Sequence, residues 1–194
     1  MTSVLTADGK EVAVRYFKGG NRYTNQCRRV VEHIDKSHAS HGENGKGPVN
    51  QRYWMQIKHL NSHYAHQISR EIVEYCKAHE VGIIAFPKYT EFYEKHVKKA
   101  SGNYSALHLS TRIREYLTYK AWQSGILVID INAKGLHENC AVCGANIVSV
   151  DKKTQECTCE AGHKTNRYLN IARNTAKRCL TQFQKKQKAS ETAG

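Results

Sequence analysis

The chain has 194 residues, 40% of them hydrophobic, which is enough for one main core and a small additional module but too few for several large domains. Lys and Arg outnumber Asp and Glu by 30 to 17, for a formal net charge of +13 at pH 7. This excess favours a polyanionic partner, nucleic acid above all, because binding to phosphates releases counterions.

The sequence also indicates the compartment. It has neither a charged amino-terminal leader nor a run near the roughly 20 apolar residues of a bilayer span. Four of the seven cysteines cluster, whereas Cys27, Cys76 and Cys179 are scattered and odd in number, which favours a reducing environment over disulfides. We therefore expect a cytosolic protein with no membrane partner.

The first part of the chain predicts a hairpin and a helix. Residues 3–7 and 11–17 have strand character, and Asp8-Gly9 between them suits a tight turn. Residues 22–38 are predicted to form a basic helix. The polar, glycine-containing stretch 37–47 is predicted to be a loop.

The middle of the chain predicts two helices between short strands. Apolar residues recur at helical spacing over 53–79 and again over 106–124. The runs at 81–86, which we expect to end at Pro87, and 126–131 suit strands that are buried on both faces. A strand, a helix and a second strand imply a parallel crossover, and a last helix is predicted over 166–187, ending in a basic string.

This order of elements is that of an α/β RNase H-like fold, in which helices cover both faces of a mixed sheet. The predicted units are a core at 1–136 with its first strand truncated, an inserted zinc ribbon at 137–164, and a final helix with a basic tail at 165–194.

Two closely spaced cysteine pairs, each on its own tight turn, suit tetrahedral zinc. Cys140 and Cys143 form the first pair, and Cys157 and Cys159 the second. His163 is the alternative to one of the later thiols, because the spacing at 157–159 is Cys-x-Cys rather than Cys-x-x-Cys. We expect one structural zinc ion per chain, with no open catalytic position.

The ribbon and the string Asn166-Arg167-Tyr168-Leu169-Asn170-Ile171-Ala172-Arg173-Asn174 resemble the RuvC-like nuclease half of transposon-encoded TnpB proteins and of the related type V CRISPR effectors. Weaker likeness extends upstream through 68–75, 82–87 and 113–121. The resemblance implies a RuvC fold of the RNase H type and nuclease chemistry in which three carboxylates hold two divalent ions.

The resemblance also locates the three carboxylates. The first belongs in a strand upstream of the opening hairpin, part of which precedes Met1. The second falls at Ala85-Phe86, and the third, the Asp of the family's Asn-Arg-Asp, falls at Tyr168. None of these side chains offers the anionic oxygens that Mg²⁺ requires, so no Mg²⁺ and no cleavage are expected. Asp130 and Glu91 are the nearest substitutes.

The resemblance therefore implies a nuclease-dead, transposon- or CRISPR-associated module of an RNA-guided DNA-binding complex, located in the prokaryotic cytoplasm in association with the nucleoid, which binds nucleic acid without cutting it. Guide RNA and target DNA are the expected partners, with a second chain or second copy supplying the missing amino-terminal half. The alternative is a metal-dependent, RNA-guided DNA endonuclease whose site is completed by another chain or by substitute carboxylates. The residues expected to contact nucleic acid are Arg22, Arg28, Arg29, Lys95, Lys98, Lys99, Arg173, Lys177 and Arg178.

Overall fold

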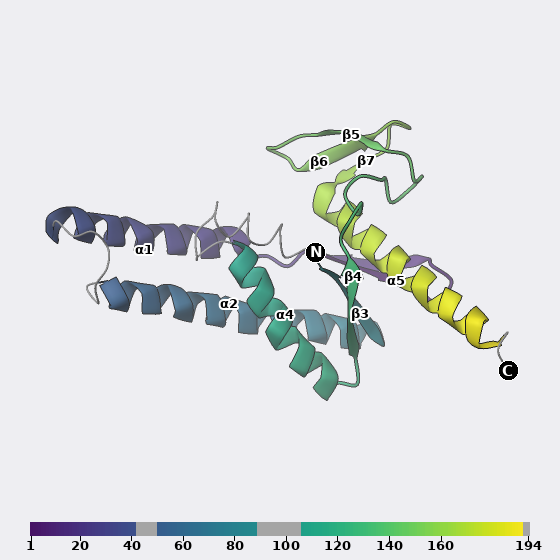
Figure 1. Ribbon diagram of the computed structural model, residues 1–194, viewed down its shortest axis with the longest axis horizontal. Coiled ribbons are helices and arrows are strands. Elements are labelled where there is room, and N and C mark those ends of the chain that lie inside the picture. Colours follow the sequence, from purple (N-terminus) through teal and green to yellow (C-terminus); the bar gives the residue numbers. More distant parts are fainter. Residues whose placement is uncertain (42–49, 89–105, 192–194) are drawn as a thin grey trace. The chain divides into compact units, whose positions relative to one another are not determined.

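The computed structural model describes residues 1–41, 50–88 and 106–191. The chain forms two compact units, shown in Figure 1. The sheet unit comprises residues 1–16, 77–90 and 126–194, and the helical unit comprises residues 17–76 and 91–125.

The helical unit is built from α1 (Gly20–His41), most of α2 (Gln51–Ala78) and α4 (Ala106–Gln123). The helix predicted at 22–38 is thus confirmed and extends to His41, so the first part of the predicted loop is helical and the rest lies outside the described residues. The apolar residues of α1 recur every three or four positions, which places them on one face of the helix. The buried cluster contains Tyr23, Cys27, Val30, Ile34, Ile57, Tyr64, Ala65 and Leu109.

Polar contacts join the helices around this cluster. The amide of Asn61 donates to the Tyr23 hydroxyl over 3.0 Å, and the Tyr23 and Tyr64 rings meet edge to face at 5.6 Å. On α4, the Lys120 ammonium donates to the His66 carbonyl over 2.7 Å and to the buried Ser69 hydroxyl over 2.8 Å. Burial, with the nearby Arg70 charge, lowers the pKa of Lys120. These bonds fix the pairing of α2 with α4.

Within the described residues, the sheet unit contains three separate sheets, followed by the helix α5. The Asp8-Gly9 turn joins the first antiparallel pair, with a φ of +87° at Gly9. The second pair is parallel, and the third sheet is the antiparallel ribbon. The elements are β1 (Thr2–Leu5), β2 (Glu11–Arg15), β3 (Ile83–Lys88), β4 (Leu127–Asn132), β5 (Ile147–Val150), β6 (Glu156–Cys159), β7 (Lys164–Asn166) and α5 (Arg167–Glu191).

The predicted parallel pairing of β3 with β4 is confirmed, and α4 lies between them in sequence. Three details differ from the expectation. β3 continues through Pro87 to Lys88. Ile83 and Leu127 are 37% and 46% exposed rather than buried, because each strand has a single neighbour within the described residues. The described strands also do not join into one sheet, so the continuous mixed sheet of an RNase H-like fold remains a prediction.

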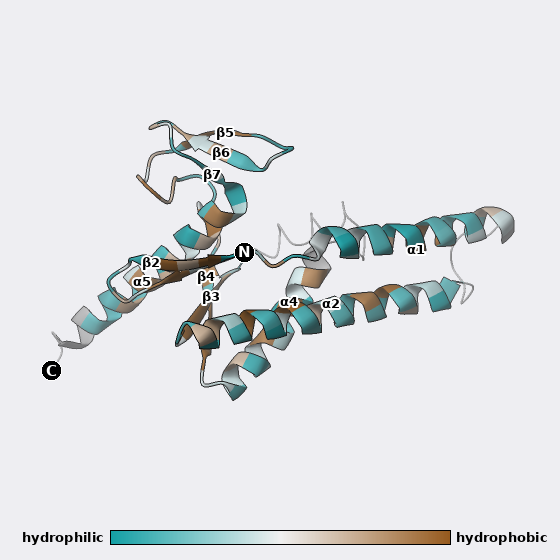
Figure 2. Cartoon of the chain, turned by 180° about the vertical axis from the view of Figure 1, so that it is seen from behind, coloured by the Kyte–Doolittle hydropathy of each residue, from teal (hydrophilic) through white to brown (hydrophobic). Residues whose placement is uncertain are grey.

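Helix α5 contacts β1, β3, β4 and β7 and thereby connects all three sheets. Figure 2 shows β2 and β3 of this unit as markedly more hydrophobic than α1. Among the helices that the structure describes, none has the length and apolar character to cross a membrane.

An ion pair fastens α5 to the hairpin. The Arg173 guanidinium makes two bonds of 2.7 Å to the two carboxylate oxygens of Glu11, and the Ser3 hydroxyl donates to the same carboxylate over 2.8 Å. The hydrogen bond from Arg173 lowers the pKa of Glu11, against the opposing effect of burial. Both side chains are only about a quarter exposed, and the two hydrogen bonds between them are charge-assisted. The pair therefore contributes more to the free energy of unfolding than an ordinary surface ion pair does.

The replacement Glu11→Gln is expected to lower the free energy of unfolding near neutral pH by about 1 to 2 kcal/mol. Since the folded-state pKa of Glu11 lies below its ordinary value of 4.5, the stabilisation is present above that value and is lost as the pH falls through the folded-state pKa. Urea unfolding of wild type and variant should therefore give a difference that is fully present at about pH 7 and shrinks progressively as the pH is lowered below 4.5.

Glu74→Gln is the matched control, because it breaks the exposed Arg70–Glu74 pair within one helix. It should change stability less than Glu11→Gln does. Equal effects of the two variants, or a difference that persists in acid, would contradict the role given to the Glu11–Arg173 pair.

Candidate metal centre and nucleic-acid interface

The first turn of the ribbon holds Cys140 and Cys143 on one knuckle. Gly144 has a φ of +81°, a conformation that favours glycine, and its N–H donates to the Cys140 carbonyl over 2.8 Å. The N–H of Val142 points back to the Cys140 sulfur at 3.4 Å. The chain therefore turns tightly enough to bring both thiols to one point.

A second knuckle, between β6 and β7, holds Cys159 and His163. Gly162 has a φ of +80°, and its N–H donates to the Cys159 carbonyl over 2.9 Å. The N–H of Cys159 in turn donates to the His163 carbonyl over 3.1 Å. The turn Cys159-Glu-Ala-Gly162-His163 thus presents one thiol and one imidazole on the same side.

The ligand atoms of Cys140, Cys143, Cys159 and His163 all lie within 4.8 Å of one another. The Cys143 and Cys159 sulfurs are 3.7 Å apart, and the Cys159 sulfur is 3.6 Å from Nδ1 of His163. Tetrahedral zinc, with bonds of about 2.3 Å to sulfur and 2.0 to 2.1 Å to nitrogen, requires ligand separations of about 3.8 and 3.6 Å. The four residues can therefore bind a metal ion, and their spacing and chemistry fit zinc.

Cys157 was predicted as a primary ligand, but it lies outside this group. Its sulfur is not among the ligand atoms that lie within 4.8 Å of one another. The Cys157 thiol donates instead to the Thr165 carbonyl on β7 over 3.3 Å. His163, the alternative to one of the later thiols, lies in the group.

The backbone favours the thiolate form of Cys140. Burial raises the pKa of this thiol, but hydrogen bonds from the N–H groups of Cys143 and Val142, together with those from the Cys143 and Cys159 side chains, outweigh burial and lower the pKa. Metal binding requires the thiolate.

Replacement of Cys157 by serine is expected to leave the metal content at about one ion per chain, because its sulfur is not a ligand. Cys143→Ser and His163→Ala each remove a ligand and should lose most of the metal on dialysis against a chelator. Elemental analysis of natively purified protein measures all three variants. If the Cys157 variant lost the metal and the His163 variant kept it, the ligands would be the four cysteines, with Cys157 in place of His163.

The cationic residues predicted to contact nucleic acid fall into three groups. Arg22, Arg28 and Arg29 are exposed on α1. Lys95, Lys98 and Lys99 lie outside the described residues. Arg173, Lys177 and Arg178 make bonds within the protein: Arg173 binds Glu11, and the other two donate to backbone carbonyls.

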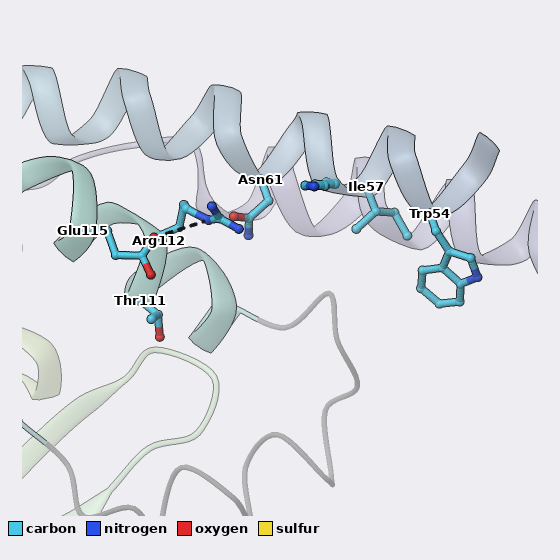
Figure 3. A pocket seen from close by; sticks show the side chains of 7 residues that line it. Trp54, Ile57, Asn61, Thr111, Arg112 and Glu115 are labelled. Carbon is cyan, nitrogen blue, oxygen red and sulfur yellow. Dashed lines mark ion pairs between the residues drawn. The ribbon is translucent and has the colours of Figure 1, made fainter. Parts of the chain in front are cut away.

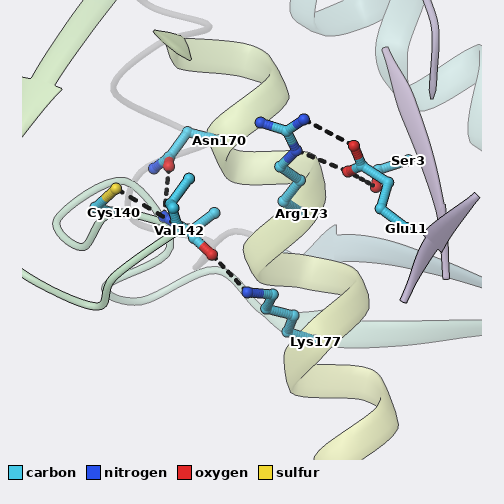
Figure 4. A network of polar contacts seen from close by, with 8 residues as sticks. Ser3, Glu11, Cys140, Val142, Asn170, Arg173 and Lys177 are labelled. Carbon is cyan, nitrogen blue, oxygen red and sulfur yellow. Dashed lines mark hydrogen bonds and ion pairs between the residues drawn. The ribbon is translucent and has the colours of Figure 1, made fainter. Parts of the chain in front are cut away.

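Sequence reasoning missed the role of one face of α5. The carbonyl clamp, as we name it, consists of Asn170, Asn174, Lys177 and Arg178, which share a helix face because they are spaced i, i+4, i+7 and i+8. The clamp binds the approach segment, residues 132–141, which leads from the end of β4 into the first knuckle. Figure 4 shows Asn170 and Lys177 directed toward this segment and Arg173 toward Glu11. The signal available in the sequence was two asparagines one turn apart on a predicted helix.

The clamp's bonds all end on backbone groups of the approach segment. Asn174 donates to the carbonyls of Leu136 and Asn139, at 2.9 and 2.8 Å. Arg178 donates to the carbonyls of Asn132 and Lys134, at 2.6 and 2.8 Å. Because this segment lies largely outside the strands, side chains of α5 satisfy carbonyls that would otherwise lack partners.

The positions of the expected carboxylates hold other side chains. Ala85 and Phe86 are half-buried on β3 and pair with Ile129 and Asp130 of β4. Tyr168 is 52% exposed in the first turn of α5. Asp130 lies 4.0 Å from the Lys88 ammonium, while Glu91 lies outside the described residues. Within the part of the chain that is described, the Cys/His cluster is the one group of three or more potential metal ligands.

The helical unit carries a pocket of about 270 Å³ between α2 and α4, shown in Figure 3. Trp54 lies at one end, and Asn61 and the Arg112–Glu115 ion pair at the other. Trp54 is 42% exposed, which agrees with a position on the rim.

Comparison with known proteins gives two matches. Residues 111–175, which include most of α4, the ribbon and the first turns of α5, match the family described as Cas12f1-like, TNB domain. A solved structure titled "Cryo-EM structure of the Cas12f1-sgRNA-target DNA complex" matches with a TM-score of 0.62 and 15% identity. The match covers 84% of this chain and 44% of that one, so the chain spans less than half the length of that protein. No curated protein matches.

Proposed function

We propose that the chain is a member of the family of TnpB proteins and type V CRISPR effectors, and that it is the RuvC-like module of an RNA-guided complex, one that binds nucleic acid without cutting it. The observation that carries the proposal is the combination of this kinship with the residues at the family's carboxylate positions. The module acts in the prokaryotic cytoplasm, where guide RNA and target DNA meet.

The side chains at the family's carboxylate positions do not suit metal-dependent cleavage. Phosphodiester hydrolysis by two metal ions needs carboxylates that gather both ions at one place. Ala85 and Phe86 stand where the resemblance expects the second carboxylate, and Tyr168 stands where it expects the third. A methyl group and two aromatic rings supply no hard anionic ligand for Mg²⁺.

The guide and the target are proposed as partners by similarity. The related structure is, by its title, a complex of Cas12f1 with a single guide RNA and target DNA. This chain matches 44% of that protein, and we propose a second chain or a second copy of this chain as a further partner in binding guide and target.

The ribbon serves this function by holding its fold through zinc. Three thiolates and one imidazole, whose ligand atoms lie within 4.8 Å of one another, would fill all four positions around a tetrahedral ion and leave none open for substrate or water. We therefore assign one structural zinc ion to each chain, with Cys140, Cys143, Cys159 and His163 as ligands.

The positive face of α1 is the proposed phosphate contact of the helical unit. Arg22, Arg28 and Arg29 are exposed there, and the chain as a whole carries a formal charge of +13. Such charges bind backbone phosphates independently of base sequence. Arg173, by contrast, is bound to Glu11, so we expect it to support the fold more than the nucleic acid.

The triple variant Arg22→Gln, Arg28→Gln, Arg29→Gln should weaken binding of guide RNA or an RNA–DNA hybrid. If each arginine neutralises a phosphate, the slope of log K against log salt concentration should become shallower by about three. Electrophoretic mobility shift or fluorescence anisotropy across a salt series measures this. Lys77→Gln, which removes an exposed cation at the end of α2, is the control. If the triple variant had the same slope as the wild type, α1 would not be part of the nucleic-acid interface.

A cleavage assay separates this function from the rival, an endonuclease completed by substitute carboxylates or another chain. With guide RNA, target DNA and Mg²⁺ or Mn²⁺, we expect the target to be bound and to remain intact. The specific observation for the rival is Asp130, which pairs in register with Phe86 at the position of the second carboxylate. Metal-dependent cuts abolished by Asp130→Asn would establish the rival.

A further inference from the structure

We infer that Asn170 and Lys177 of α5 are positioning residues of the metal centre, which set the shape of the first knuckle and so raise its affinity for the ion. The inference rests on the zinc site proposed above and concerns residues that are not themselves ligands. Its basis is a pair of hydrogen bonds to a single residue, Ala141, which lies between the ligands Cys140 and Cys143.

Asn170 is 1% exposed and uses both ends of its side-chain amide. Its oxygen accepts from the Ala141 N–H over 2.7 Å, and its nitrogen donates to the Asn139 carbonyl over 2.8 Å. The opposite orientation of the amide would place a donor against a donor and an acceptor against an acceptor. The two hydrogen bonds therefore fix the backbone at Asn139 and at Ala141, on either side of Cys140.

Lys177 binds the carbonyl of Ala141, the second polar group of its backbone. Its ammonium donates to the Ala141 carbonyl over 2.5 Å, so α5 binds both the N–H and the C=O of this residue. Ala141 is itself 5% exposed, and buried backbone groups require such partners. Replacing either side chain would leave a polar group of the knuckle without its hydrogen bond.

This hold has a direct consequence for the ligands. With Ala141 fixed, the next N–H, that of Val142, is directed at the Cys140 sulfur, and the spacing of Cys140 and Cys143 is set before an ion arrives. Groups outside the ligand set that orient the ligands in this way typically change metal affinity by 10- to 100-fold. The ion gains affinity because less of its binding free energy is spent on ordering the turn.

The same contacts would transmit the effect of a bound ion to α5. Because any coupling of equilibria is reciprocal, an ion bound at the knuckle stabilises the first turns of α5, where Asn170 lies two residues beyond Tyr168. The metal centre and the position of the family's third carboxylate are thus parts of one coupled structure.

Titration of the purified full-length chain with Co²⁺ tests the inference, because bound Co²⁺ gives thiolate charge-transfer and d–d absorption, and displacement by Zn²⁺ then yields the zinc affinity. Asn170→Asp keeps the acceptor for Ala141 and loses the donor to Asn139, whereas Asn170→Leu loses both at similar volume. We expect affinity to fall by about 10- to 100-fold in the leucine variant, and by less in the aspartate variant and in Lys177→Met.

Lys185→Met is the matched control for Lys177→Met, because Lys185 is an exposed lysine further along the same helix. It should bind Co²⁺ as the wild type does. Amide hydrogen exchange supplies a second readout: the Ala141 and Val142 amides should lose protection in the Asn170 variants more than amides of α1 and α2 do.

Each outcome decides the inference. If the Asn170 variants fold poorly, the replacement Lys177→Met at an exposed position still tests the inference, and a wild-type affinity for Co²⁺ in that variant would overturn it. A purely structural role would lower the stability of the metal-free chain and leave the affinity of the folded chain unchanged. If the wild-type protein bound no Co²⁺, the assignment of the metal site itself would be wrong. If it failed to bind nucleic acid, the proposed function would be wrong, but the measured effect of Asn170 and Lys177 on metal affinity would still stand.

Discussion

The hydrogen bonds between α5 and the approach segment are the interactions on which the sheet unit depends. Residues 132–141 lie largely outside the strands, so their carbonyls find partners in side chains rather than in a neighbouring strand. One face of α5 supplies those partners, and an adjacent position of the same helix binds the hairpin through Arg173 and Glu11. A single helix thus joins three small sheets, none of which has more than three strands, and isolated sheets of this size are marginal in water.

The metal centre and α5 support each other. Two glycine turns bring the ligands together from opposite ends of the ribbon, and an ion would close that loop and contribute folding free energy. The ribbon alone has little apolar material: Val142, Val148 and Val150 are 40% to 61% exposed. Contact with α5, and a metal ion when one is bound, would therefore stabilise it more than a core of its own does.

Much of this arrangement could be predicted from the sequence. Periodicity located α1, α2, α4 and α5, the apolar runs located β3 and β4, and Asp8-Gly9 located the hairpin turn. The sequence could not choose between Cys157 and His163, because the choice depends on which of these side chains the fold brings to Cys140, Cys143 and Cys159. It also suggested that Arg173, Lys177 and Arg178 bind phosphate, since a charge pattern does not reveal the carbonyls and the carboxylate that they meet in the fold. Partners distant in sequence, such as Glu11 and Arg173, leave no local signal.

The exclusion of Cys157 from the ligand set also bears on the chemistry of sulfur in this protein. Cys27, Cys76, Cys157 and Cys179 are all buried, and burial raises the pKa of each thiol, so each is a poor nucleophile at neutral pH. Cys143 is exposed, and an ion would shield it from alkylation. An oxidant or a maleimide should consequently attack the protein first at the ribbon, and the rate of that attack reports how much of the protein has lost its ion.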